Sequence, residues 1–233
     1  MHSNQFTVAT MTWARSAEED ALLRRALTSL AACGMPLVIA DAGVSTSFLR
    51  FLERLPHASV VVPSDRGLIP QISTSLEAAG SHRSRFILYT EPDKQSFFER
   101  GLCDFVRAAG NHPDAGVILA SRSPESLLTF PRMQRYAEGV INNLCGELVG
   151  VTGDFSYGPF VMDSALVPFV AGLDPRLGWG WRHFIFRTAH RQGRRIALIA
   201  GDYPCPEQQR MEDDAERSHR LRQLSQNLLG LID

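Results

Sequence analysis

Two kinds of hydrophobic pattern alternate along the first half of the chain. Short, almost wholly apolar runs are separated by longer segments in which apolar residues recur every three or four positions. The short runs are typical of strands buried on both faces of a parallel sheet, and the longer segments of helices that pack on one side. This alternation predicts an α/β protein with a doubly wound parallel sheet. The predicted strands are residues 6–12, 36–40, 60–62, 86–89 and 117–120, and the predicted helices are residues 16–33, 67–79 and 95–109, with another beginning near Thr46.

The pattern changes after Pro131. A helical period runs to about Val149, and residues 153–159 form a loop rich in glycine and aromatic residues. The second half is therefore not a repeat of the first. Its remaining predicted elements are an edge strand at 160–162, a helix at 181–192, a strand at 195–199 and an amphipathic closing helix at 212–231.

The composition suits one globular domain. The chain has 233 residues, 44% of them hydrophobic, and a formal net charge of -1. That charge gives no reason to expect a nucleic acid or an anionic membrane as the main partner. The four cysteines are scattered singly, without the spacing of a zinc site, which indicates reduced thiols. Because the sequence has no signal-peptide pattern and no run of about 18 apolar residues, we expect a cytoplasmic protein without an integral membrane segment.

Polar residues follow the predicted strands directly. Thr10 lies near the end of the first strand, Asp41 follows the second, Arg66 follows the third, and Glu91 and Asp93 follow the fourth. Ligands of open α/β sheets bind at the carboxyl ends of the strands, so these residues are candidates for binding. Asp41 could accept hydrogen bonds from a ribose or a base, although an aspartate at this position can also cap the next helix.

Glu91-Pro92-Asp93 is the sharpest candidate for metal chemistry. Two carboxylates beside a rigid residue at the end of an apolar strand can hold Mg²⁺ or Mn²⁺, which in turn binds a diphosphate. The alternative is that Pro92 begins a helix whose first turn favours acidic residues because of the helix dipole.

Two segments near the C-terminus add candidates. Trp179, in Gly178-Trp-Gly-Trp-Arg-His183, could stack on a sugar, or it could simply pack beside the glycines. His219, in the predicted closing helix, could supply a nitrogen ligand to the same metal, or it could be a surface residue.

The order of these motifs resembles that of nucleotide-sugar glycosyltransferases with the GT-A fold, of the family-2-like kind. The resemblance spans nearly the whole chain, and the order and spacing of its pieces carry it. Residues 216–224 are also similar to a segment in the branch that contains glucosyl-3-phosphoglycerate and mannosylglycerate synthases. The matching pieces are the strand at 8–12, Asp41 with Gly43-x-Ser45-Thr46, Arg66-Gly67, Glu91-x-Asp93, and the block from Gly178-Trp-Gly180 to Gly193-Arg-Arg-Ile196.

The resemblance implies a Rossmann-like, mostly parallel GT-A sheet flanked by helices, with a C-terminal helix. It divides one domain, 1–233, into a nucleotide-binding half at 1–122, an acceptor and sugar half at 123–210, and the closing helix at 211–233. It also implies roles for individual residues. The donor would be bound by Thr10, Asp41, Arg66, Glu91, Asp93 and Trp179, the metal by Glu91, Asp93 and His219, and the sugar or acceptor by Gly153, Asp154 and Trp179.

The sequence departs from the family pattern at two places. The usual DxD motif has become Glu91-x-Asp93, which keeps both carboxylates but changes their reach. The acidic residue that often follows the Gly-Trp-Gly turn, as general base on the acceptor, is replaced by the segment Trp181-Arg182-His183. Asp154 or His183 would then be the catalytic base, or the reaction would be retaining, with the leaving phosphate helping to activate the acceptor.

We therefore expect a metal-dependent transfer of a sugar from a UDP- or GDP-sugar to a small polar acceptor, with Mg²⁺ or Mn²⁺ as cofactor. Arg122, Arg182 and Arg194 could bind an anionic acceptor, or they could be solvated surface residues. A homodimer is left open. Two alternatives remain: a non-catalytic nucleotide-sugar-binding relative or scaffold, and a nucleotidyltransferase, against which the glycine-free loop at 12–16 counts.

Overall fold

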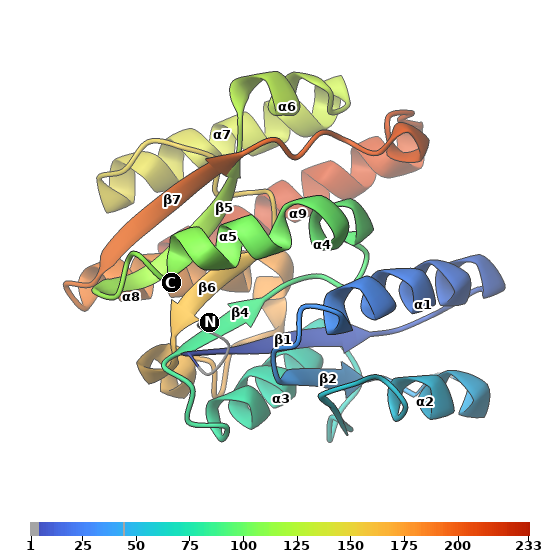
Figure 1. Ribbon diagram of the computed structural model, residues 1–233. Coiled ribbons are helices and arrows are strands. Elements are labelled where there is room, and N and C mark those ends of the chain that lie inside the picture. The colour runs from blue at the N-terminus through green and yellow to red at the C-terminus, as the bar shows by residue number, and fades with distance from the viewer. Residues whose placement is uncertain (1–4, 44) are drawn as a thin grey trace.

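The computed structural model describes residues 5–43 and 45–233, and in these residues seven strands form one sheet (Figure 1). Four strands are parallel and lie in the order β3-β2-β1-β4. β1 and β2 are buried along their whole length, as their apolar runs predict. Their bounds are β1 Phe6–Thr12, β2 Leu37–Asp41, β3 Ala58–Val61 and β4 Phe86–Tyr89.

The other half of the sheet contains an antiparallel strand. β6 (Phe160–Asp163) lies between β4 and β5 (Ala115–Arg122) and is antiparallel to both, and β7 (Arg195–Gly201) is parallel to β5. The prediction of β6 as an edge strand is therefore wrong. Its side chains explain its central place, since Phe160 enters the hydrophobic core on one face of the sheet and Val161 the core on the other.

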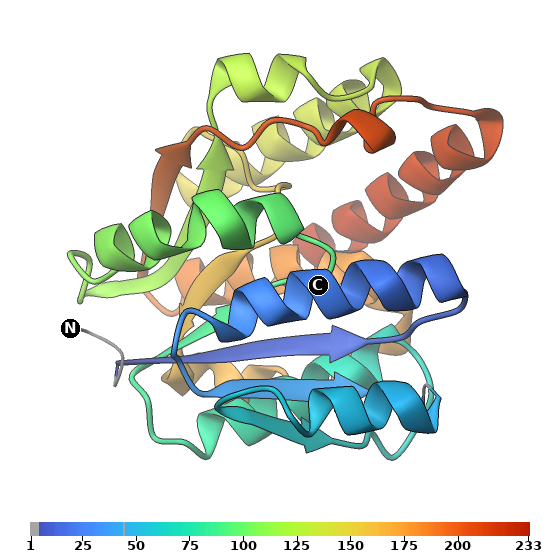
Figure 2. The same ribbon diagram turned by 45° about the vertical axis from the view of Figure 1, so that its right-hand side comes forward.

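Helices cover both faces of the sheet (Figures 1 and 2). The α/β fold with a mostly parallel sheet and a C-terminal helix is thus confirmed. On one face lie α1 (Ala17–Ala31), α2 (Thr46–Leu52), α4 (Gln95–Arg100) and α5 (Leu102–Ala109), and on the other lie α3 (Leu68–Gly80), α7 (Arg132–Val149), α8 (Trp181–Arg191) and α9 (Asp214–Ile232). A short helix, α6 (Pro124–Leu128), and the 3₁₀ turns η2 (Ser164–Phe169), η3 (Pro175–Gly180) and η4 (Glu207–Gln209) complete the described elements.

The predicted helix at 95–109 is divided at Gly101 into α4 and α5. A Cβ atom at Gly101 would lie 2.6 Å from Cε1 of Tyr203. Tyr203 packs its ring against Phe97, with the ring centroids 5.3 Å apart. The glycine thus lets the segment after β7 approach the helix pair closely.

α9 closes the molecule by packing against η3, α7 and α8. Its Gly230 lies so near Gly180 that an added Cβ atom would be 2.0 Å from the carbonyl oxygen of Gly180. Two glycines therefore set the separation between α9 and the start of α8. Within residues 5–43 and 45–233, no helix combines the length and the apolar character needed to cross a membrane.

Candidate functional site

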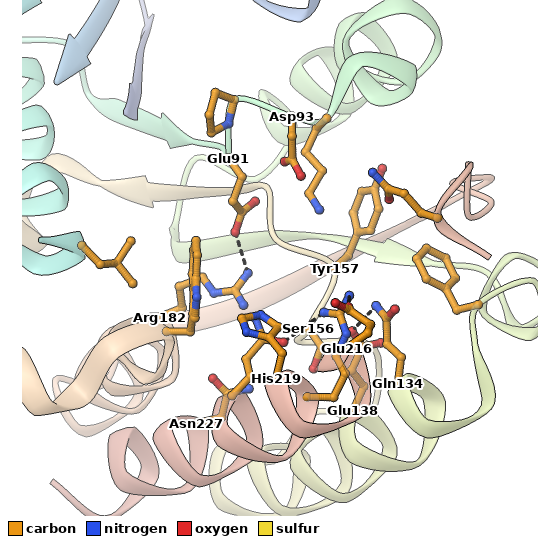
Figure 3. A pocket seen from close by; sticks show the side chains of 18 of the residues that line it. Glu91, Asp93, Gln134, Glu138, Ser156, Tyr157, Arg182, Glu216, His219 and Asn227 are labelled. Carbon is orange, nitrogen blue, oxygen red and sulfur yellow. Dashed lines mark hydrogen bonds and ion pairs between the residues drawn. The ribbon is translucent and has the colours of Figure 1, made fainter. Parts of the chain in front are cut away.

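A cleft of about 970 Å³ opens beside the carboxyl ends of β1 and β4 (Figure 3). One wall comes from the segments that follow these strands. Residues of α7, α8 and α9 line much of the rest, together with shorter contributions from α3, from the loop before β6 and from the segment between β7 and α9. This is the place where an open α/β sheet binds its ligand. The polar and aromatic lining includes Trp13, Arg15, Gln71, Glu91, Asp93, Lys94, Arg122, Gln134, Glu138, Ser156, Tyr157, Trp179, Arg182, Glu216, His219, Arg220, Gln223 and Asn227.

Glu91 is held in the wall of the cleft by an arginine. Its Oε1 accepts a hydrogen bond from Nη1 of Arg182 at 2.9 Å, and both residues are buried. Its Oε2 is also buried and has no hydrogen-bond partner in the described part of the chain. Gly158 lies against this oxygen, because an added Cβ atom there would be 2.2 Å from it. The Glu91 carboxylate is therefore fixed between Gly158 and the Arg182 guanidinium.

The three residues predicted to bind a metal line the same cleft without forming a metal site. Figure 3 shows His219 rising from α9 on the side opposite Glu91 and Asp93. Partial burial, together with Arg220, lowers the pKa of His219. Among the residues described, no three His, Cys, Asp or Glu side chains are close enough to hold a metal ion. Since Glu91 already binds a guanidinium, this donor set does not fit the predicted three-ligand site.

Trp179 and Arg182 lie together at the start of α8. Trp179 is half-buried and lines the cleft, and Cζ of Arg182 is 5.7 Å from the centroid of its ring. The next tryptophan, Trp181, is fully buried and packs edge-on against Tyr89 at a centroid distance of 4.8 Å. Trp181 therefore anchors α8 to the sheet, while Trp179 and Arg182 line the cleft.

Asp154 lies outside the cleft lining, in a buried network with Arg122. Arg122 Nε donates to Asp154 Oδ2 at 2.6 Å, and Arg122 Nη2 donates to Glu138 Oε2 at 2.6 Å. Burial alone would raise the pKa of Asp154, but the charge and hydrogen bonds of Arg122 outweigh it and hold that pKa below its usual value. The Asp154 carboxylate is thus engaged in structure, which disfavours the predicted role as catalytic base.

His183 also lies outside the cleft lining and is completely buried. Burial, aided by the positive charge of Arg182, lowers the pKa of His183 to about 3. Neither ring nitrogen has a hydrogen-bond partner among the residues described. A neutral imidazole without access to the cleft is not placed to take a proton from an acceptor.

The predicted nucleoside residues are at the edge of the cleft rather than in its lining. Thr10 is buried, and its Oγ1 donates to the carbonyl of Thr90 at 2.8 Å. Asp41 accepts from Thr12 Oγ1 at 2.8 Å and from the Gly43 amide at 3.2 Å. Arg66 is exposed in the loop before α3. Gln71 connects this region to the cleft, because it lines the cleft and donates to the carbonyl of Thr12 at 2.9 Å.

α7 and most of the lining face of α9 contribute residues that no sequence motif indicated. Gln134 and Glu138 line the cleft, and Gln134 Nε2 donates to Glu138 Oε1 at 2.8 Å. Glu216 and Arg220 form an ion pair at 2.6 Å on α9. Both pairs are spaced four residues apart on a predicted helix, which is a signal for neighbouring side chains but not for a cleft.

Neither a family model nor a curated protein sequence matches this chain. Solved structures of glucosyl-3-phosphoglycerate synthase from Mycobacterium tuberculosis are similar in fold. The complex with Mn²⁺, UDP and glucosyl-3-phosphoglycerate has a TM-score of 0.65 and 14% identity, and the match covers 98% of this chain and 80% of that one. The complex with phosphoglyceric acid has a TM-score of 0.66 and 15% identity, with the same coverage. At this low identity the likeness shows the fold alone: the chain has the GT-A fold that its motifs predict.

Proposed function

We propose that the protein is a glycosyltransferase that binds a nucleotide-sugar in the cleft and transfers the sugar to a small polar acceptor. The observation that carries the proposal is the position of Glu91-Pro92-Asp93, which follows β4 and lies in the wall of a large cleft of a GT-A fold. The cleft volume of about 970 Å³ is within the range of ligand-sized sites. Trp179 offers a face on which a sugar can stack.

The similar structures support the classes of donor and acceptor. The Mycobacterium tuberculosis enzyme has been crystallised with UDP-glucose, phosphoglyceric acid and Mn²⁺, and also with UDP and Mg²⁺. As part of the proposal, we expect this chain to use a UDP- or GDP-sugar as donor and a small, anionic molecule as acceptor. A divalent cation has the same support, but the pairing of Glu91 with Arg182 counts against the predicted ligand set.

The roles of single residues remain proposals of unequal support. Asp93 and Trp179 line the cleft. From there Asp93 would reach the donor diphosphate through a bound cation, and Trp179 would contact the sugar directly. Thr10, Asp41 and Arg66 would act at the edge that holds the nucleoside. The role of Asp154 or His183 as catalytic base stays a prediction, and the burial of both residues disfavours it. The cleft therefore supports donor binding more directly than it supports either residue as the base.

A second candidate is a nucleotide-sugar-binding relative without transferase activity. The observation that favours it is the place of Arg182. This residue lies in the segment where an acidic base is expected, and it forms an ion pair with the carboxylate of Glu91. Release of UDP or GDP from the bound donor, on addition of phosphorylated and carboxylated acceptors, would contradict this candidate. Tight binding of an intact nucleotide-sugar without any release would favour it.

The donor site is tested by calorimetric titration with UDP-glucose, GDP-mannose, UDP and GDP, first with Mn²⁺ and then with EDTA. We expect one base to bind in at least one of the two conditions. Asp93→Ala should weaken any part of that binding that depends on Mn²⁺, whereas Arg194→Gln should leave binding unchanged, because Arg194 pairs with Asp163 at 2.9 Å and does not line the cleft. If none of the four compounds binds in either condition, the donor-site assignment fails. Cytoplasmic location and homodimer formation are further proposals, which cell fractionation and light scattering would test.

A further inference from the structure

The carboxylate that ends β4 already has a cation bound to it. Arg182 and Glu91 are joined at 2.9 Å, and their side chains keep only 4% and 10% of their exposed area. The proposed donor would place a diphosphate in this part of the cleft. We infer that the Arg182 guanidinium, and not a divalent metal ion, supplies the fixed positive charge for that diphosphate, an inference that rests on the proposed function.

The backbone of Arg182 is anchored beside Glu91. It follows Trp181, whose ring is fully buried against Tyr89 and Phe160. On the other side of the pair, the Glu91 carboxylate lies so close to Gly158 that a side chain at position 158 would collide with it. A metal ion that bound Glu91 would have to displace a buried guanidinium, and leaving one member of a buried pair without its partner is strongly unfavourable.

Arg182 also has hydrogen-bond capacity left for a ligand. A guanidinium carries five N–H groups, and the single hydrogen bond of Arg182 in the described chain is the one from Nη1. Its Nε is buried without a partner, as is Oε2 of Glu91. Arg182 lines the cleft, and the forked geometry of arginine suits phosphate oxygens.

Most of the other cations that line the cleft form ion pairs away from the end of β4. Arg15 pairs with Glu19, Arg122 with Glu138 and Asp154, and Arg220 with Glu216. Lys94 lines the cleft without an ion pair among the residues described, with its Nζ 5.6 Å from the centroid of the Tyr157 ring. Arg182 is paired as well, but its partner is Glu91. Lys94, next to Asp93, and Arg182, bound to Glu91, are therefore the two lining cations that the structure places at the end of β4.

The test compares calorimetric binding of UDP and GDP in EDTA and in Mn²⁺. For wild-type protein we expect the nucleotide that binds to do so equally well in both conditions. Arg182→Ala should weaken binding in EDTA about tenfold or more, the loss expected for a hydrogen bond to a charged group. The affinity of Arg182→Lys for the nucleotide should lie between those of wild-type protein and Arg182→Ala, because lysine keeps the positive charge but lacks the forked guanidinium. Arg194→Gln is the matched control, an ion-paired arginine outside the cleft whose loss should leave binding unchanged.

A second measurement uses Mn²⁺ alone, followed by electron paramagnetic resonance. Wild-type protein should leave the metal free, whereas Arg182→Ala should bind it, because Glu91 is then released to join Asp93. The thermal unfolding midpoint shows whether each variant is folded. The comparison of EDTA with Mn²⁺ for wild-type protein does not depend on any variant. Nucleotide binding that requires Mn²⁺ in the wild type would overturn the inference and leave the proposed function standing. EDTA-resistant binding that Arg182→Ala and Arg182→Lys both retain would also overturn it, whereas no nucleotide binding in either condition would overturn the proposed function itself.

Discussion

Arg122 lies at the centre of a buried network in which each member depends on the others. It donates to Asp154 and Glu138, and Asn142 Nδ2 also donates to Asp154 Oδ1, at 3.1 Å. Burial alone would lower the pKa of Arg122, but the two carboxylates raise it above its ordinary value. Because Glu138 belongs to α7 and Arg122 to β5, the network fixes one wall of the cleft to the sheet. Asp154 is thus best understood as a positioning residue for that wall.

His183 carries the first prediction, because its burial makes folding sensitive to acid. Its pKa falls from 6.5 to about 3 on folding, so between these values the unfolded chain binds the extra proton. The stabilising effect of the neutral ring is complete above pH 6.5 and is lost as the pH falls toward 3. His183→Leu should remove a slope of about 1.4 kcal/mol per pH unit from the free energy of unfolding. Denaturant titrations at pH 5.0, 5.5, 6.0 and 7.0 would measure it.

The control for this prediction is His219→Leu. His219 is exposed and its pKa is lowered less strongly, so this variant should keep most of the acid dependence. An unchanged pH slope in His183→Leu would contradict the burial of a neutral imidazole at position 183.

Residue types in the sequence indicated chemistry but not which way each side chain faces. Glu91, Asp93, Trp179 and His219 were predicted from their place after a strand or near a helix start, and they do line one cleft. The pattern around Asp154 is equally polar, yet its carboxylate is buried against a cation from a strand 32 residues earlier. Such a contact is set by tertiary packing, which single-residue patterns do not contain.

At the scale of elements, apolar periodicity was enough to locate most helices and strands. β1 and β4 have the predicted bounds. β4 is apolar throughout, and β1 combines apolar residues with threonines, whose β-branched side chains favour strands. The central place of β6 was not predictable in this way, since a four-residue strand buried on both faces has the same pattern wherever it pairs. The order of strands in the sheet is a property of long-range pairing and not of any one segment.

The docking of α9 gives the second prediction. Gly230→Ala would place a Cβ atom 2.0 Å from the carbonyl oxygen of Gly180, and backbone on both sides leaves little room to adjust. We expect a loss of about 1–3 kcal/mol in the free energy of unfolding, together with weaker nucleotide binding, because α9 carries His219 and Glu216 into the cleft.

Gly139→Ala in α7 is the matched control. It lies inside a helix with no atom within 4 Å of an added Cβ, so it should stabilise the protein by up to about 1 kcal/mol through helix propensity. Equal effects of the two substitutions in urea unfolding would show that the Gly180–Gly230 contact is not tight.

At the scale of the whole molecule, the cleft joins parts of the chain that are far apart in sequence. Its lining includes residues from the ends of β1 and β4, from α7 and α8, and from α9 between Glu216 and Asn227. β6 binds the two halves of the sheet together by pairing with β4 on one side and β5 on the other. A ligand in the cleft would therefore contact both halves at once, and its binding energy would add to the stability of the whole fold.

The third prediction follows from this arrangement. A nucleotide at about 100 times its dissociation constant should raise the free energy of unfolding by about 2.7 kcal/mol. Hydrogen exchange should slow most at the amides around Asp93 and in residues 216–223, because both line the cleft. The amides of α2 are the internal control, since this helix packs on the opposite face of the sheet and contributes nothing to the lining. Local protection at the end of β4 without protection in α9 would place the ligand on one wall only, and this would contradict a ligand that contacts both walls of the cleft.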